Sequence, residues 1–412
     1  MRIGTSLALA VLSLSMLHAD ENWPQFRGPH GDGHADAKGV PIHWSESENI
    51  RWKTAIRGRG WSSPVIWGNQ IWLTTAPVDG KQKFALCLDR ASGKIIHDIL
   101  LFPEEKPAPL GVDYNSYASP TPALEEGRVY VHFGSPGTAC LDMATGKELW
   151  QRTDFECNHY RGPASSPVIF GKLLILTFDG YDLNYLVALD KETGQTVWKK
   201  DRNIKYVSSN GDLHKAYSTP TLLELDGRPQ AISPAADATI SYDPRSGEEL
   251  WRVYHGGMNT ASKPVIGHGL IYLTSGSAGN LLALRLGGAG DVSSQVRWKI
   301  IKGAPKRASL LLDGELLYMV NDDGIATCVE AKTGKVNWQE RVGKEYSASP
   351  IMADGHIYFC DDGGKTHVVK PGREFTEVAV NTLDAGCRAS PAAVSDAIYL
   401  RTKTHLYCIG KK

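Results

Sequence analysis

The sequence predicts an all-β fold, an eight-bladed β-propeller made of four-stranded antiparallel blades. Two observations carry this prediction: a strand-rich unit recurs about every 47 residues, and it recurs eight times along the chain. A third observation concerns the ends of the repeat. The last unit lacks its outer strand, while a spare strand of the same type precedes the first unit. We therefore expect a ring closed by an N-terminal strand that joins the last blade.

The clearest copy of the unit covers residues 165–198, SSPVIFGKLLILTFDGYDLNYLVALDKETGQTVW. Short β-branched or aromatic runs alternate there with Gly, Asp and Asn, which mark turns. We expect four strands, namely Ser-Pro-Val-Ile at the start, then Lys172–Phe178, Tyr185–Asp190 and a last strand that ends at Trp198. A unit of this size cannot bury both faces alone, so it needs neighbours of its own kind.

The other copies keep the same frame. Each opens at an anchor that is a proline in seven copies and a leucine in one. The anchors are Pro64, Pro120, Pro167, Pro220, Pro264, Leu310, Pro350 and Pro391. Several copies end on an Asp-x-x-Thr/Ser-Gly turn, in which the carboxylate can accept backbone N–H bonds and the glycine takes the left-handed conformation. A tryptophan four residues after that glycine is expected to pack between blades. The spare strand is Asn49–Ile56, NIRWKTAI.

The ends of the chain indicate export. Residues 1–19 resemble a signal peptide, with Arg2, a short apolar core and a Leu-His-Ala cleavage site. We expect an irregular leader over residues 20–43 and one propeller domain over residues 44–412. The apolar run is short for a membrane span. The expected product is a monomer without a stable membrane span after signal cleavage, either periplasmic or secreted.

Composition narrows the class of partner. The 45 basic and 45 acidic residues give a formal net charge of zero, which disfavours nucleic-acid binding. None of the seven cysteines is adjacent to another, and none has zinc-site spacing. Several occupy matched strand positions, which favours free thiols in the core. An exported protein could instead form a disulfide, and Cys360 with Cys387 is then the first pair to consider.

The central mouth of the ring is the expected binding face. The residue two positions before the first residue of each anchor dipeptide should point into it, and insertions near residues 103–116, 203–216 and 287–296 should form loops around it. The predicted ligand-binding residues are Trp61, Tyr117, Arg161, Lys215, Tyr217, Arg307, Tyr346 and Arg388. An aromatic and basic mouth could hold a planar anionic ligand or a peptide carboxylate. The alternative is a solvated rim without a ligand.

Two other motifs favour structural roles. Asp322-Asp323-Gly324 and Asp361-Asp362-Gly363 stand at equivalent hairpin turns, and Asp-Gly is a turn signal before it is a cation site. His30 and His34 flank Asp32 in a Gly-rich loop, which indicates a surface loop more than a metal site.

The repeated pattern Ser-Pro-x-Val, Gly-x-Ile-Tyr, Ala-Leu-Asp-x-x-Thr-Gly-x-x-x-Trp resembles the PQQ-type repeat. That repeat is named for the quinoprotein dehydrogenases, and it also occurs in non-enzymatic propellers such as the one in the bacterial outer-membrane protein assembly machine. The resemblance implies an eight-bladed ring. For the dehydrogenases it would also imply PQQ against a vicinal Cys-Cys disulfide, calcium ligands and an aspartate base. This chain has no Cys-Cys pair, and no position matches those calcium or base residues.

The expected function is therefore an exported, non-catalytic propeller scaffold. It would bind an unidentified protein partner or a small anionic ligand on its funnel face, with no catalytic residue, no metal and no cofactor. One alternative is a divergent PQQ-dependent dehydrogenase that also uses calcium. A second alternative is an outer-membrane protein assembly factor. Fold alone does not decide between them.

Overall fold

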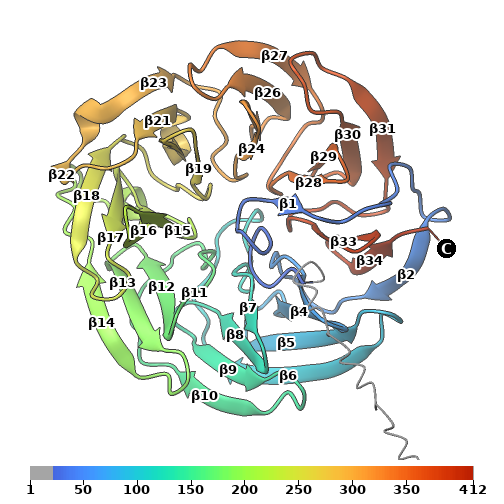
Figure 1. Ribbon diagram of the computed structural model, residues 1–412. Helices are drawn as coiled ribbons and strands as arrows, with labels where there is room; N and C mark the ends of the chain where they lie inside the picture. The colour runs from blue at the N-terminus through green and yellow to red at the C-terminus, as the bar shows by residue number, and fades with distance from the viewer. Residues whose placement is uncertain (1–21, 412) are drawn as a thin grey trace, which may run out of the picture.

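A computed structural model describes residues 22–411, and the predicted signal peptide at residues 1–19 lies outside them. The described residues form eight antiparallel sheets arranged as blades around a central axis (Figure 1). They contain no α-helix, only the short 3-10 turns η2 (Gly211–His214), η3 (Gly276–Ala278) and η4 (Ser293–Gln295). The all-β, eight-bladed propeller predicted from the sequence is confirmed.

Blades 1 to 7 each run from an inner strand to an outer strand in chain order. Blades 1 to 3 consist of β3 (Val65–Trp67), β4 (Gln70–Thr75), β5 (Gln82–Asp89) and β6 (Ile95–Pro103); β7 (Ala123–Glu125), β8 (Arg128–His132), β9 (Thr138–Asp142) and β10 (Glu148–Arg152); and β11 (Val168–Phe170), β12 (Leu173–Asp179), β13 (Asn184–Asp190) and β14 (Thr196–Asp201). Blades 4 and 5 consist of β15 (Thr221–Leu225), β16 (Arg228–Pro234), β17 (Ala238–Tyr242) and β18 (Glu249–Tyr254), with β22 (Gly290–Asp291) added in parallel; and β19 (Val265–Gly267), β20 (Leu270–Thr274), β21 (Leu281–Arg285) and β23 (Val296–Ile300).

Blades 6 to 8 complete the ring. They consist of β24 (Leu311–Asp313), β25 (Leu316–Val320), β26 (Ile325–Glu330) and β27 (Val336–Arg341); β28 (Ile351–Ala353), β29 (His356–Cys360), β30 (Lys365–Val369) and β31 (Glu377–Thr382), with β1 (His34–Ala35) added in parallel; and β32 (Ala392–Val394), β33 (Ala397–Arg401), β34 (His405–Ile409) and β2 (Ile50–Ala55). In the third unit, the inner strand begins at Val168, two residues after Ser166, and the outer strand continues past Trp198 to Asp201.

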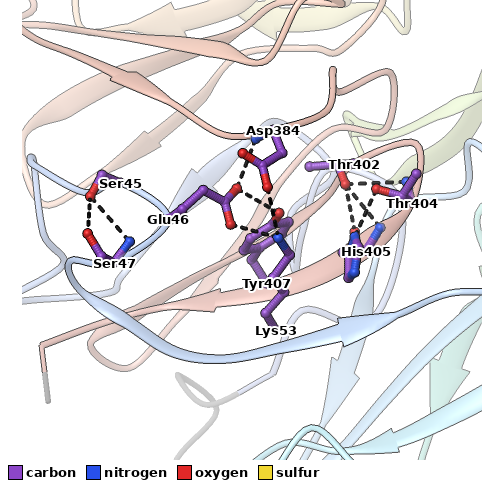
Figure 2. A network of polar contacts seen from close by, with 9 residues as sticks. All are labelled: Ser45, Glu46, Ser47, Lys53, Asp384, Thr402, Thr404, His405 and Tyr407. Atoms are coloured by element: carbon purple, nitrogen blue, oxygen red, sulfur yellow. Dashed lines mark hydrogen bonds and ion pairs between the residues drawn. The ribbon is translucent and has the colours of Figure 1, made fainter.

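The N-terminal strand β2 pairs antiparallel with β34, so this early segment of the chain supplies the outer strand of the last blade (Figure 1). The register joins Trp52 to Cys408. Side chains reinforce this junction: Lys53 Nζ lies 2.7 Å from Glu46 Oε2 and 3.2 Å from Asp384 Oδ2, and Glu46 also accepts a hydrogen bond from Tyr407 (Figure 2). Opposite ends of the chain are thus held together by backbone and ion-pair contacts.

An outer ring of aromatic contacts ties successive blades together. Trp150, Trp198 and Trp298 each donate their indole N–H to a backbone carbonyl of the next blade, over 3.0 Å. Their rings also cover the turn glycines of that blade, which have φ near +70°. Trp52 of the closing strand makes the same contact with the turn at Gly93 in blade 1. The tryptophans therefore pack between blades, as the repeat predicts.

Several blades depart from this pattern. Blade 1 has His97 and blade 7 has Ala379 at the position that holds tryptophan in the other six, and the His97 ring covers Gly146. Trp251 in blade 4 instead donates to Gln230 of its own blade, because the next blade carries an insertion in place of the tight turn. The seven cysteines are free and buried, which agrees with the core thiols expected from their matched positions.

Candidate functional site

The inner ends of the blades form a hydroxyl-lined ring around the axis. The backbone N–H of one blade donates to the Ser or Thr hydroxyl of the next at six of the eight junctions, over 2.8 to 3.0 Å. The residues of this ring are Ser63, Thr121, Ser166, Thr219, Lys263, Ser309, Ser349 and Ser390. We call these eight residues the inner ring. Each hydroxyl that accepts an N–H keeps its own O–H as a donor.

The inner ring shows that one of the anchors predicted from the sequence repeat is wrong. In blade 2 the ring residue is Thr121, followed by Pro122 and β7, whereas the sequence analysis chose Pro120. Two successive Ser/Thr-Pro dipeptides, Ser119-Pro120 and Thr121-Pro122, make the frame ambiguous. The shift of two residues moves the mouth position of blade 2 from Tyr117 to Ser119.

A cavity of about 470 Å³ lies on the axis at the level of the inner ring. Its wall includes the residue two positions before the inner-ring residue in every blade. These mouth residues are Trp61, Ser119, Ala164, Tyr217, Ala261, Arg307, Ser347 and Arg388. Six of the inner-ring residues also line it, together with Asn259, Ser277, Lys306, Asp322 and Asp323. A cavity of this size falls in the range of small-molecule sites.

One end of the cavity is covered by the leader. Trp23 pairs with Ile66, and the carbonyl of Pro24 accepts from Leu124 N, so the leader contacts the inner strands beyond the inner ring. Arg27 is fully buried there and donates to the carbonyls of Leu310 and Pro350. Burial lowers the pKa of the Arg27 guanidinium to about 10. Phe26, the residue before it, lines the cavity.

The inner-ring position of blade 5 is unusual. Lys263 replaces the hydroxyl found in the other seven blades, and it lies beneath Gly31 of the leader with only 5% of the residue exposed. Burial, together with the charge of Arg27, lowers the pKa of the Lys263 ammonium to about 7, while Asp32 opposes the shift. The leader thus buries its own Arg27 against the ring and packs on the buried Lys263 of blade 5.

The other end of the cavity is covered by the loop of residues 104–116, which we call the lid. Its C-terminal part is held by arginines from four different places in the ring. The guanidinium groups of Arg59 and Arg388 donate to the carbonyl of Asp113. Arg161 donates to the Tyr114 hydroxyl over 2.7 Å, and Arg307 lies 5.8 Å from the centre of the Tyr114 ring. Tyr114 and Asn115 line the cavity.

The two arginines of the cavity wall are paired with carboxylates. Arg307 Nε lies 2.8 Å from Asp322 Oδ1, and Arg388 Nε lies 2.7 Å from Asp362 Oδ2. Burial raises the pKa of Asp362, and the ion pair with Arg388 opposes that shift. For Arg307, burial alone would lower the pKa, but the charge of Asp322 raises it overall. The wall is therefore close to electrically balanced on the side of blades 6 to 8.

Four of the eight predicted binding residues line the cavity: Trp61, Tyr217, Arg307 and Arg388. Of the other four, Arg161 holds the lid from outside the cavity wall. Lys215 is fully buried against Asp212 and the Tyr160 ring.

The two remaining predicted tyrosines pack into other parts of the blades. Tyr117 donates to the carbonyl of Ala108 in the lid, because the frame of blade 2 is shifted. Tyr346 is fully buried and donates to Val342, because it neighbours the mouth residue Ser347 and points the opposite way.

Sequence reasoning missed several residues that line the cavity or pair with its arginines. Asp322 and Asp362, treated as turn residues, are the partners of the two cavity arginines. The sequence signal that could have identified these two aspartates is their occurrence at equivalent turns of neighbouring blades. Tyr114, Asn115 and Phe26 come from segments outside the repeat, so no periodic signal could place them.

Within residues 22–411 no group of three or more His, Cys, Asp or Glu side chains is placed to hold a metal ion. The same residues include no helix long and apolar enough to cross a membrane.

Comparison with known proteins places the chain in a family. The family model described as "Outer membrane protein assembly factor BamB" matches residues 35–203, 87–340 and 236–406 in overlapping segments. These matches cover most of the chain, so the chain belongs to this family.

One curated relative is the tetrathionate hydrolase of Acidithiobacillus ferrooxidans, 25% identical over 253 residues. That alignment covers 58% of this chain and 48% of the relative, so the chain spans about half the length of the curated relative it matches.

Solved structures support the fold. BamB from Moraxella catarrhalis superimposes with a TM-score of 0.61 at 14% identity, covering 87% of this chain and 99% of that one. A europium-containing methanol dehydrogenase gives a TM-score of 0.71 at 10% identity, with 93% and 89% covered. The quinohemoprotein alcohol dehydrogenase of Comamonas testosteroni gives 0.67 at 12% identity, with 95% and 81% covered. At these identities the likeness concerns the fold alone.

Proposed function

From membership of this family, we propose that the chain is an exported, non-catalytic propeller that binds a small ligand in its central cavity. One observation carries the proposal: the cavity lies between two segments outside the repeat, the leader with Phe26 at one end and the lid with Tyr114 at the other. Such covers exclude water from a bound ligand, and they are not needed to close the ring.

The construction of the lid supports a role in binding. Loops of this length without regular structure are usually functional or disordered, and this one is anchored by four arginines. The contacts join blades 1, 3, 6 and 8 through one short segment. A ligand that enters from this side must displace some of these contacts, which would couple binding to opening of the lid.

We propose that the cavity works without PQQ or calcium. The described residues that line it include no cysteine, so nothing corresponds to a disulfide platform. Asp322 and Asp362, the carboxylates nearest the cavity arginines, are engaged in ion pairs and are not grouped as metal ligands. The residues present therefore do not fit a quinone held beside a calcium ion.

A second candidate function is hydrolysis of an anionic substrate. The match to a tetrathionate hydrolase favours it, together with three basic residues on the cavity wall, Lys306, Arg307 and Arg388. A third is the assembly of outer-membrane proteins, which the family description suggests. The enclosed cavity favours a small-molecule function over this third one, because a protein client would contact the outer surfaces and not the enclosed volume.

A thermal-shift titration of the mature protein tests the proposal. A ligand that binds only the native state raises the melting temperature in a saturable manner. We expect such a shift with at least one small molecule, and a weaker shift in the Arg388→Ala variant than in Arg245→Ala, whose side chain lies on an exposed outer turn. Turnover of tetrathionate by the purified protein would favour hydrolysis, and PQQ-dependent alcohol oxidation would favour the dehydrogenase.

A further inference from the structure

We propose that Cys360 and Cys387 form a disulfide when the protein is exported, and that this bridge fastens blade 8 to blade 7. The inference rests on the export that is part of the proposed function, because disulfides form and persist in oxidising compartments. It does not depend on a ligand in the cavity. The structure holds both residues as thiols, which is the reduced form of the pair.

The end of β29 in blade 7 and the segment that enters blade 8 lie directly against each other. The backbone N–H of Cys387 donates to the carbonyl of Asp361, over 3.0 Å. A Cβ on Gly386 would lie 1.6 Å from the carbonyl oxygen of Asp362, so only a glycine permits this approach of the two backbones. The contact therefore involves residues that directly adjoin Cys360 on one segment and Cys387 on the other.

The two cysteine side chains converge at this contact. Cys360 shares a core cluster with Tyr358 of its own strand and Leu400 of blade 8, and Cys387 belongs to the same cluster. Phe359, the neighbour of Cys360, packs into a different cluster on the other face of the blade. The Cys387 thiol is in hydrogen-bond contact with Cys360. Two cysteines can be bridged where their backbones are close and their side chains point at each other, and both conditions hold here.

The bridge forms by exchange with a small-molecule or protein disulfide, which is the oxidant. The thiolate of one cysteine attacks a sulfur of that disulfide, forms a mixed disulfide and releases a thiolate. The second cysteine then attacks the protein sulfur of the mixed disulfide and releases the other half of the oxidant. Two protein thiols are oxidised, the oxidant is reduced to two thiols, and the two protons of the protein thiols pass to them.

The exchange takes place before blades 7 and 8 dock. In the folded protein, the contact with Cys360 and burial raise the pKa of the Cys387 thiol well above its usual value, so the reactive thiolate is scarce. The two residues are also only 1% and 2% exposed, which keeps reagents away. Residues 361–386 alone separate the cysteines, so the loop to be closed is short. After docking, the same burial protects the bridge from reductants.

The bridge would also support the wall of the central cavity. Asp362 lies two residues after Cys360, and Arg388 directly follows Cys387. These two charged side chains form an ion pair in which Arg388 Nε lies 2.7 Å from Asp362 Oδ2, and Arg388 also holds the lid through the carbonyl of Asp113. A covalent bond beside this ion pair fixes the two segments that carry it, so it stabilises a blade junction and a lid anchor together.

Thiol counting on the mature protein tests the inference. The protein is produced in the oxidising periplasm of an expression host and, as the reduced reference, in the cytoplasm, and its free thiols are alkylated after denaturation. We expect five of the seven cysteines to be alkylated in the first sample and all seven in the second. A non-reducing digest of the first sample should contain one linked peptide pair, with Cys360 and Cys387. This sample should also melt a few degrees higher, because the bridge restricts the unfolded chain.

Two variants that each lose one buried thiol provide the comparison. Cys387→Ala should leave all six remaining cysteines free, and its melting temperature should be the same from either compartment. Cys140→Ala removes a fully buried thiol of blade 2 and should keep the bridge. It should therefore show four free thiols and the same rise in melting temperature on export as the wild type. The wild-type count decides the matter even where a variant fails to fold.

Seven free thiols in the protein from the periplasm, or a linked pair other than Cys360 with Cys387, would overturn the inference. Neither result bears on the cavity, because a thermal-shift titration of the reduced protein tests ligand binding separately. Conversely, a bridged protein that binds no small molecule would keep the bridge and count against the proposed ligand site.

Discussion

The outer ring and the mouth residues of this propeller obey different rules. On the outside, most blades offer their neighbour the same surface, so one solution recurs: a tryptophan donates to a turn carbonyl and covers a turn glycine. On the inside, all eight blades meet one another at a single cavity. The mouth residues there range from Ala164 to Trp61 and Arg388. Repetition therefore marks the residues that stabilise the ring, and its loss marks the residues that define the site.

The largest expected effect compares a tryptophan of the outer ring with the tryptophan among the mouth residues. Trp198→Ala removes an interblade side chain that is 9% exposed and bonded to Pro244, and should lower the free energy of unfolding by about 3–5 kcal/mol. Trp61→Ala should cost less stability, because Trp61 borders a cavity, but should abolish ligand binding. Urea denaturation and calorimetry on both variants measure the two properties. Equal stability losses would show that the outer ring and the mouth residues do not differ in this way.

A second effect concerns Lys263, the inner-ring residue that breaks the hydroxyl pattern. Its pKa is about 7 in the folded protein and higher in the unfolded chain, so the unfolded chain binds more protons between those values. The free energy of unfolding should therefore rise with pH from about 7 towards 10, with a slope of up to about 1.4 kcal/mol per pH unit from this group.

The Lys263→Met variant removes that contribution. It should be more stable than the wild type by a few kcal/mol, on the order of the cost of burying a charge, at pH 6, and this advantage should shrink as the pH rises to 10. Denaturation at several pH values measures the difference between the two proteins. A difference independent of pH would mean that Lys263 is not buried beneath the leader as described.

A glycine pair tests the outer contact more finely. Gly194 has φ of +72°, and a Cβ there would lie 2.7 Å from the Trp150 ring, whereas Gly171 has φ of +56° and open space around it. Gly171→Ala should cost about 1–2 kcal/mol from backbone strain alone. Gly194→Ala should cost more, because the tryptophan must also move. If both variants melt alike, the tryptophan contact is too loose to act as an interblade lock.

The smallest effect belongs to the ion pairs that flank the closing strand (Figure 2). The Lys53 and Glu46 side chains are about 30% exposed, so Lys53→Met should cost less than about 1 kcal/mol. That cost should fall further at 1 M salt, where exposed charges are screened. A cost of several kcal/mol that persists in salt would mean that the ion pairs, rather than the strand pairing of β2 with β34, hold the ring closed.

The repeat in the sequence was sufficient to predict the blades, because each blade uses the same turns and the same aromatic contacts. It was less informative about the site. The prediction that Tyr117 lines the cavity is wrong because two successive Ser/Thr-Pro dipeptides make the repeat frame ambiguous there. The prediction for Tyr346 is wrong because adjacent residues of an extended chain point in opposite directions. The lid and the leader have no repeat counterpart, and their contacts with Arg307, Arg388 and Arg27 join residues far apart in the chain.

The central claim is that a small molecule binds in the cavity between the lid and the leader. Ala164 and Ala261 are the smallest mouth residues, so Ala164→Phe should fill much of the space without disturbing the outer ring. The direct measurement is calorimetric titration of this variant with the probe that gives the wild type its largest saturable thermal shift. The account predicts that Ala164→Phe melts within a few degrees of the wild type and loses binding. A variant that folds normally and binds that probe as tightly as the wild type would contradict it.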